Sequence, residues 1–233
     1  MRKSFGRMLA CSALGSLALL SQAHGAVLDF ESIAPGSAFV AGDTFSEGEF
    51  TWKVGGTFGY VDGAAGFETS SGLQAPTGDA TQFYSGLNDS RVTLTRTDGK
   101  AFNLTGFMAG FVTPSSQAAG VYAGQIIVHA VDSAGTPIDQ NWQFSPSGAN
   151  GTFAFSTYHE ADDFSNLVSL TSVTFTSCVF TSVTSSVCRN PASNLAQFSI
   201  DNIGVSAVPE PSSLVLLALG LGGLGLRSRR GSR

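Results

Sequence analysis

Short runs of alternating apolar and polar residues, broken by Gly, Asp, Asn and Pro, fill the middle of the chain. Seventeen of the 18 Phe lie between residues 26 and 208, against eight Leu, and Thr, Ser, Val and Gly are abundant there. Aromatic and β-branched side chains fit the half-buried surface of a pleated sheet. No window shows a sustained apolar stripe at the helical period. The pattern therefore predicts an all-β fold.

Turn signals divide this region into short strands. Asp98-Gly99 and Ser133-Ala134-Gly135 are typical turn sequences, and 114–124 is expected to be a mobile loop. Strands are expected near 27–33, 50–54, 57–61, 81–84, 91–96, 102–111, 125–131, 141–144, 152–157, 170–180 and 197–205. This spacing predicts an antiparallel β-sandwich of jelly-roll type.

The C-terminal segment, 209–233, differs in character. Pro209 and Pro211, on either side of Glu210, keep the chain extended, so that a helix can start only after them. Residues 213–226 carry no charge and would form a helix of roughly 21 Å, short of the roughly 30 Å hydrocarbon core of a membrane. We expect a transmembrane-like helix here, followed by a basic end that stays cytoplasmic: Arg227, Arg229, Arg230 and Arg233.

This order of Pro-Glu-Pro, apolar helix and arginines resembles the PEP-CTERM sorting signal of Gram-negative bacteria. The resemblance implies recognition and cutting near Pro-Glu-Pro by an exosortase, a membrane protease, in bacteria that commonly make exopolysaccharide. Gln197, Phe198 and Asp201 also resemble the Gln-Phe-x-x-Asp run of one PEP-CTERM group. The alternative is an ordinary C-terminal membrane anchor that is never cut.

The N-terminus has the pattern of a signal peptide. A basic start, 1–7, precedes an apolar stretch over 8–20. Small residues at Ala23 and Gly25 favour cleavage by signal peptidase before Ala26, and cleavage after Ala23 is the second choice. We therefore expect a signal helix in 1–25, a β-sandwich domain in 26–208 and a sorting segment in 209–233, which passes transiently through the inner membrane.

The predicted domain is acidic. Residues 26–208 hold five Lys and Arg against 16 Asp and Glu, a formal net charge of −11. Such a surface argues against nucleic acid and anionic membranes as partners. It suits an exported protein, or one that binds divalent cations.

Cys178 and Cys188 are the two cysteines of the predicted domain. In an exported chain, a pair spaced ten residues apart predicts a disulfide. There is no C-x-x-C spacing, and the nearest histidine, His159, is 19 residues away, so a zinc site has little support.

The first and last predicted strands carry matching patterns. Leu28 and Phe30 share one face of the first strand, and Phe198 and Ile200 share one face of the last. Ile203 and Val205 have changed parity, which predicts a β-bulge at Asp201-Asn202. We expect these two strands to pair and close the sandwich.

The same strands resemble those of jelly-roll carbohydrate-binding modules, where acidic groups hold a structural calcium ion. The resemblance implies four donors, which are Asp29, Glu31, Asp201 and Asn202. Calcium takes six to eight oxygen ligands, and carboxylate and amide groups can supply them. The alternative is that these side chains cap backbone amides at a bulge or turn.

Catalysis has little support in the sequence. His129 and His159 lie far in sequence from any evident nucleophile, and the acidic group Glu160, Asp162 and Asp163 suits a solvated loop. Aromatic rings can stack on sugars, which makes Trp52, Tyr122 and Trp142 candidate ligand-binding residues, with core packing as the alternative.

The sequence therefore predicts an exported surface or extracellular-matrix protein, not an enzyme, whose β-sandwich binds exopolysaccharide. Two alternatives are a secreted glycan-active hydrolase and a purely structural matrix component.

Overall fold

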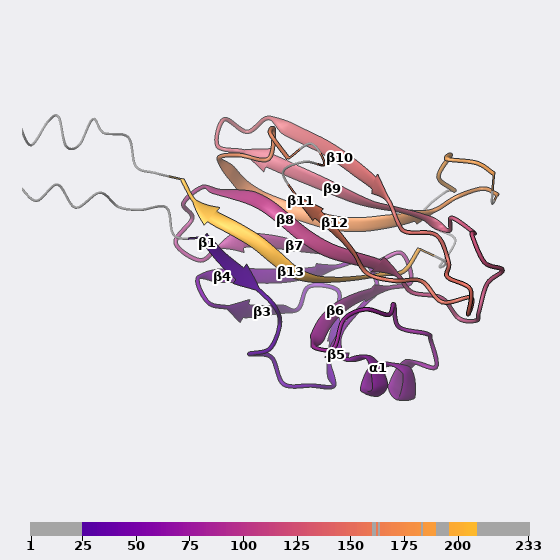
Figure 1. Ribbon diagram of the computed structural model, residues 1–233. Coiled ribbons are helices and arrows are strands. Elements are labelled where there is room, and N and C mark those ends of the chain that lie inside the picture. The colour runs from indigo at the N-terminus through magenta and orange to yellow at the C-terminus, as the bar shows by residue number, and fades with distance from the viewer. Residues whose placement is uncertain (1–24, 160–161, 163, 183, 190–195, 209–233) are drawn as a thin grey trace, which may run out of the picture. The chain divides into compact units, whose positions relative to one another are not determined.

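The alternating runs of the sequence form the strands of an antiparallel sheet. The computed structural model describes residues 25–159, 162, 164–182, 184–189 and 196–208, and in this part of the chain it has 13 strands and one short helix (Figure 1). The elements are β1 (Gly25–Leu28), β2 (Ser37–Val40), β3 (Thr44–Glu47), β4 (Phe50–Gly55), β5 (Phe58–Gly63), α1 (Ala64–Ser71), β6 (Gln82–Leu87), β7 (Arg91–Arg96), β8 (Phe102–Phe111), β9 (Gly124–Asp132), β10 (Pro137–Gln143), β11 (Ser156–His159), β12 (Leu170–Val179) and β13 (Phe198–Ala207).

The strand order is that of one large sheet that curls almost into a barrel. One half has the order β2-β5-β6-β13-β8-β11, with β1 also beside β13, and the other has the order β3-β4-β7-β12-β9-β10. The pair Leu170–Phe102 joins β12 to β8 and so links the halves. The ladders between these strands are antiparallel, which confirms the predicted fold class at this level.

The core lies between the inward faces of the two halves. In β4, Phe50, Trp52 and Val54 are buried and alternate with more exposed residues, as the period of a strand requires. Aromatic rings join one half to the other: Phe107 of β8 lies 5.2 Å from Phe175 of β12, measured between ring centroids. The many Phe side chains of the sequence thus pack between the two halves and hold them together.

The first and last strands pair, as predicted. β1 runs antiparallel to β13, with Leu28 opposite Ile203 and Gly25 opposite Ser206 (Figure 1). The register of β13 on β8 shifts after Asp201, and Asn202 has φ 51°, so the predicted bulge is confirmed. The bulge returns Ile203 and Val205 to the same buried face as Phe198 and Ile200.

The first strand is shorter than the sequence predicted. β1 ends at Leu28, and Phe30 has φ 57°, so Asp29 and Glu31 do not continue the ladder opposite β13. The cause is the buried carboxylate of Glu47, whose Oε1 accepts the backbone N–H groups of Asp29 and Phe30, both at 2.8 Å. The turn still places the Phe30 ring in the core, 5.1 Å from Trp52.

A second, smaller apolar cluster lies around α1. Phe67 of the helix is fully buried and packs 5.8 Å from Phe83 of β6, together with Ala75, Leu87 and Val112. The sequence pattern did not predict this helix, nor β2 and β3. The helix is only eight residues long and ends at Gly72, which has φ 70° and donates its N–H to the carbonyl of Glu68.

Within the described ranges, no helix has the length and apolar character needed to cross a membrane. The predicted signal helix and the predicted C-terminal helix lie outside the described residues, as do the sorting residues Pro209, Glu210, Pro211, Arg227, Arg229 and Arg230.

Candidate functional site

The structure brings one predicted metal ligand, Asp201, against the carboxylate of Asp79, which no sequence pattern indicated. Asp201 is fully buried on the face of β13 opposite Phe198 and Ile200. Its Oδ2 accepts hydrogen bonds from Asn202 Nδ2 at 2.7 Å and from Thr81 Oγ1 at 3.3 Å. Thr81 Oγ1 also lies 2.5 Å from Asp79 Oδ1, so one hydroxyl connects the two carboxylates.

Both carboxylates have an oxygen without a partner. Oδ1 of Asp201 and Oδ2 of Asp79 are buried and accept no hydrogen bond from the described residues. The pKa of Asp201 is raised to about 9. Burial is the main cause, and the neighbouring Asp79 carboxyl adds to it. A shared proton or a bound cation would each satisfy this pair, which we call the Asp79–Asp201 pair.

The donor chemistry of the pair fits calcium in kind. Two carboxylates and the Thr81 hydroxyl are hard oxygen donors, the type that calcium prefers. Glu31, distant in sequence, contacts the same segment, because its Oε1 accepts the backbone N–H of Gln82, the residue after Thr81, at 2.7 Å. Asp29 instead accepts the N–H of Glu31 at 3.2 Å, as the capping alternative expected. Among the described residues, no group of three or more His, Cys, Asp or Glu is arranged to hold a metal.

The three aromatic candidates differ sharply in exposure. Trp52 is fully buried in the core, so its prediction as a ligand-binding residue is wrong: a ring packed at 5.1 Å from Phe30 presents no face to a sugar. Trp142 is partly buried, stacks on Phe164 at 4.9 Å, and donates its indole N–H to the Asp162 carbonyl at 2.6 Å. Tyr122 is 41% exposed, and it lines a cavity.

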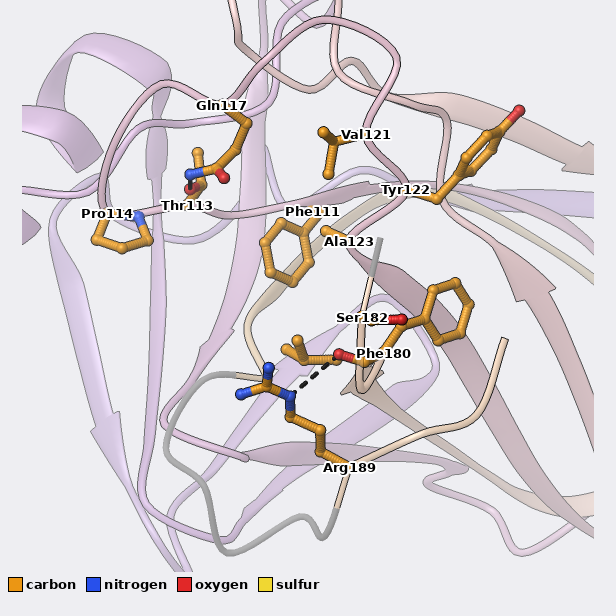
Figure 2. Close-up of a pocket in the computed structure, with 11 residues that line it drawn as sticks. Phe111, Thr113, Pro114, Gln117, Val121, Tyr122, Ala123, Phe180, Ser182 and Arg189 are labelled. Atoms are coloured by element: carbon orange, nitrogen blue, oxygen red, sulfur yellow. Dashed lines mark hydrogen bonds between the residues drawn. The ribbon is translucent and has the colours of Figure 1, made fainter. Parts of the chain in front are cut away.

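This cavity, which we call the Tyr122 cavity, has a volume of about 280 Å³. The loop between β8 and β9 forms one side, and the chain after β12 forms the other. Figure 2 shows Thr113, Gln117 and Val121 on the first side and Phe180, Ser182 and Arg189 on the second. The full lining is Phe111, Thr113, Pro114, Gln117, Val121, Tyr122, Ala123, Val179, Phe180, Ser182 and Arg189.

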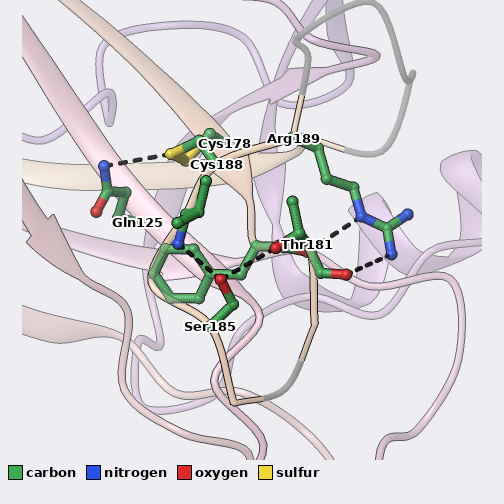
Figure 3. The surroundings of a disulfide bond; sticks show 8 residues. Gln125, Cys178, Thr181, Ser185, Cys188 and Arg189 are labelled. Carbon is green, nitrogen blue, oxygen red and sulfur yellow. Dashed lines mark hydrogen bonds between the residues drawn. A yellow bond between two sulfur atoms is a disulfide. The ribbon is translucent and has the colours of Figure 1, made fainter.

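The predicted disulfide fixes the second side of the cavity. Cys178 and Cys188 are bonded, with their Cα atoms 5.5 Å apart, and Arg189 follows directly (Figure 3). The Arg189 backbone N–H donates to the Val179 carbonyl at 2.7 Å. Its guanidinium donates from Nε to the Phe180 carbonyl at 3.1 Å and from Nη2 to the Thr181 carbonyl at 3.3 Å. The cysteine spacing predicted the disulfide, whereas no sequence pattern pointed to Arg189.

The loop on the first side is held by its own polar contacts. Gln117 donates from Nε2 to the Ser115 carbonyl at 2.9 Å, and its backbone N–H donates to the Gly151 carbonyl at 2.9 Å. The hydroxyl of Ser147 donates to the Ala118 carbonyl and accepts the N–H of Val121 at 3.0 Å. The segment expected to be a mobile loop is therefore tied to the connection between β10 and β11, which contains Ser147 and Gly151.

The two histidines of the domain lie apart from this cavity. His129 Nδ1 of β9 is 2.6 Å from Asp139 Oδ1 on the adjacent strand β10, and both side chains are exposed. The backbone N–H of His159 donates to Asp162 Oδ2 at 2.9 Å. Glu160 and Asp163, the rest of the predicted acidic loop, lie outside the described residues. The described contacts are those of surface residues, in line with the sequence analysis.

Comparison with known proteins identifies the C-terminal segment. Residues 207–230 match the family model described as the PEP-CTERM protein-sorting motif. The predicted resemblance of the tail is thereby confirmed; the Gln197-Phe198-x-x-Asp201 run stays a prediction. No curated protein matches the chain.

Solved structures resemble the β-domain. A DUF4465 family protein from Bacteroides caccae has a TM-score of 0.52 and 14% identity, covering 79% of this chain and 100% of that one. An arabinose-bound α-L-arabinofuranosidase, MgGH51, has a TM-score of 0.34 and 10% identity, covering 76% and 25%. The protein CtCBM11 has a TM-score of 0.28 and 14% identity, covering 82% and 99%. Only the first score is above 0.5, and at this identity it speaks for the fold alone.

Proposed function

We propose that this chain, which carries a PEP-CTERM sorting motif over residues 207–230, is an exported protein whose 26–208 domain binds a secreted polysaccharide without acting on it enzymatically. The motif implies an exported protein that is anchored transiently in the membrane and processed by an exosortase. The binding proposal rests on one observation, the exposed ring of Tyr122 at the Tyr122 cavity. The final location that we propose is the cell surface or the extracellular matrix.

Processing is the first part of the proposal to test. Signal peptidase would remove the residues before Ala26, and the exosortase would cut near Pro209-Glu210-Pro211. Intact-mass analysis of the exported protein from its native host should then find neither segment. If most molecules keep the arginines of the tail, the segment acts as a permanent anchor instead.

The case for a polysaccharide is chemical. The exposed tyrosine offers an aromatic face to the C–H groups of a sugar ring, and its hydroxyl is a polar group beside it. A cavity of about 280 Å³ is slightly smaller than the roughly 300–1,000 Å³ typical of small-molecule sites, a size that suits one sugar ring. The rest of a long polysaccharide would stay outside the cavity, and a site exposed at a loop leaves room for it.

The binding test uses the exported protein and the exopolysaccharide of its host. Tyr122→Ala should weaken the retardation of the protein in an affinity gel that contains the polysaccharide. Val40→Ala is a matched control, because Val40 is 55% exposed on β2 and takes no part in the cavity lining. Equal retardation of the two variants would contradict the proposal for this site.

The alternatives remain distinguishable. A glycan-active hydrolase would need two carboxyl groups on either side of the scissile bond. The carboxyl pair that the structure brings together, Asp79 and Asp201, instead has a fully buried member. New reducing ends after incubation with the polysaccharide would favour the hydrolase. Absence of binding to any polysaccharide would favour a purely structural matrix component.

We also propose a structural calcium ion at the Asp79–Asp201 pair, and a jelly-roll type for the fold. Support for the ion comes from the two buried carboxylate oxygens that lack a partner. Support for the jelly roll comes from the two halves of the curled sheet and from the pairing of the first and last strands.

A further inference from the structure

We infer that the Tyr122 cavity selects an acidic sugar, whose carboxylate pairs with the guanidinium of Arg189 while its ring lies against Tyr122. The inference rests on the proposed binding of a polysaccharide, and it names the chemical class of the sugar. Both residues line the same cavity, from the two segments that form its opposite sides, with the Tyr122 ring pointing outward, away from Arg189 (Figure 2).

Arg189 is held in place but keeps donors for a ligand. A guanidinium has five N–H donors, and two of them are used, by the Phe180 and Thr181 carbonyls. These two acceptors are neutral, so they orient the group without cancelling its charge. The disulfide and the Val179 carbonyl fix the backbone beneath it. An oriented guanidinium with free N–H groups suits paired hydrogen bonds to a carboxylate.

The charge of Arg189 is unusual in this domain. It is one of five cationic side chains against 16 acidic ones. Arg96, by comparison, lies 3.0 Å from Glu49 and 2.8 Å from Asp98. In the part of the chain that the structure describes, no carboxylate lies within ion-pair distance of Arg189. A cation held without a counter-ion next to a cavity is a site for an anionic ligand.

The rest of the lining agrees with a sugar acid rather than a small inorganic anion. Phe111, Val121, Phe180 and the Tyr122 ring are apolar or aromatic, and they match the C–H faces of a sugar. Gln117 and Ser182 provide amide and hydroxyl groups for ligand hydroxyls. Arg189 is the charged side chain in this lining. Its single positive charge therefore matches a sugar that carries one carboxylate.

The negative charge of the remaining surface makes the recognition selective. A polyanion is repelled by a domain of net charge −11 except where a cation lies. Binding of an acidic polysaccharide should therefore depend on this one pairing, and salt should affect it in two opposed ways. Screening weakens the Arg189 pairing and also weakens the general repulsion.

The test compares oligomers that differ at C6, where one carries a carboxylate and the other a hydroxymethyl group. The exported protein is titrated with galacturonic acid oligomers and with galactose oligomers of the same length, by calorimetry at fixed salt. We expect the acidic oligomer to bind about tenfold more tightly or better, the size expected for a charge-assisted hydrogen-bonded pair. Arg189→Gln should remove this preference, so that the variant binds the two oligomers with equal affinity.

Two further variants keep the test decisive. Arg189→Lys retains the charge and should keep part of the preference for the acidic oligomer. Tyr122→Ala should lower the affinity for both oligomers by the same factor. Arg91→Gln is the matched control, since it removes a cation at the first residue of β7 and should leave the preference intact. Mass analysis of each unreduced variant verifies that the Cys178–Cys188 bond has formed.

The outcomes separate the inference from the proposal beneath it. Equal affinity of the wild-type protein for both oligomers would overturn the acidic preference and leave polysaccharide binding standing. A preference that survives in Arg189→Gln would overturn the role of Arg189. Failure to bind either oligomer or the host polysaccharide would overturn both the inference and the proposed function.

Discussion

Replacing Asp201 with asparagine should change how the stability of the domain depends on pH. Burial and the Asp79 carboxyl raise the pKa of Asp201 from 3.8 to about 9. Between these two values the folded protein holds a proton that the unfolded chain releases. The free energy of unfolding then falls as the pH rises, by at most about 1.4 kcal/mol per pH unit for one proton. Asparagine has no proton to release, so its variant lacks this contribution.

The magnitude follows from that slope. From pH 5 to pH 7 the group would lower the free energy of unfolding of the wild-type protein by up to about 2.7 kcal/mol. Contributions from groups that do not contact Asp201, such as Glu47, whose pKa is also raised by burial, occur in both proteins and cancel in the difference. The Asp201→Asn variant should therefore gain stability relative to the wild type as the pH increases.

Urea denaturation between pH 5 and pH 8 measures this difference, with a chelator present so that only the proton is at issue. Asp98→Asn is the control. The hydrogen bond from Arg96 lowers the pKa of Asp98 to about 2. Titration of Asp98 therefore affects stability only below the assay range of pH 5 to pH 8. A stability difference between wild type and Asp201→Asn that stays constant across the range would refute the reasoning.

Three further predictions concern the ion, the disulfide and the core. Millimolar calcium should raise the melting temperature, because a ligand of the folded state alone stabilises it, and Asp201→Ala should abolish the rise in a calorimetric scan. Replacing Cys178 and Cys188 together by alanine should lower the free energy of unfolding by roughly 2–3 kcal/mol for a ten-residue loop, as measured in urea; no change would mean that the bond does not form. Gly86→Ala should cost about 1–3 kcal/mol in the same assay, because the new methyl would lie 2.5 Å from the Phe198 ring, and an unchanged stability would show that the ring can move away.

Part of the fold could be predicted because strands have a fixed period. The change of parity between Ile200 and Ile203 was enough to place the bulge, since only an added residue keeps both on the buried face. The matching faces of the first and last strands likewise predicted their pairing. The disulfide followed from the number and spacing of the cysteines.

The rest depends on contacts between distant segments. Asp79 and Asp201 are more than a hundred residues apart, and nothing in their local sequences links them. The short helix α1 has little amphipathic pattern and gains its place by burying Phe67 in a tertiary cluster. Whether an aromatic ring is buried or exposed also depends on tertiary packing, which is why the sequence did not show that Trp52 lies in the core. The position of Arg189 beside a cavity depends on tertiary packing in the same way.

The position of β13 has a consequence for the timing of export. This strand lies between β8 on one side and β6 and β1 on the other, yet it comes last in the domain, and the sorting motif begins at its end. Until β13 has crossed the membrane, β6 and β8 have open edges and the sheet cannot be completed. Completion of the fold and arrival of the sorting signal are therefore nearly simultaneous. A chain truncated before residue 198 would lose its central strand and its address together, so that only full-length molecules could be both folded and sorted.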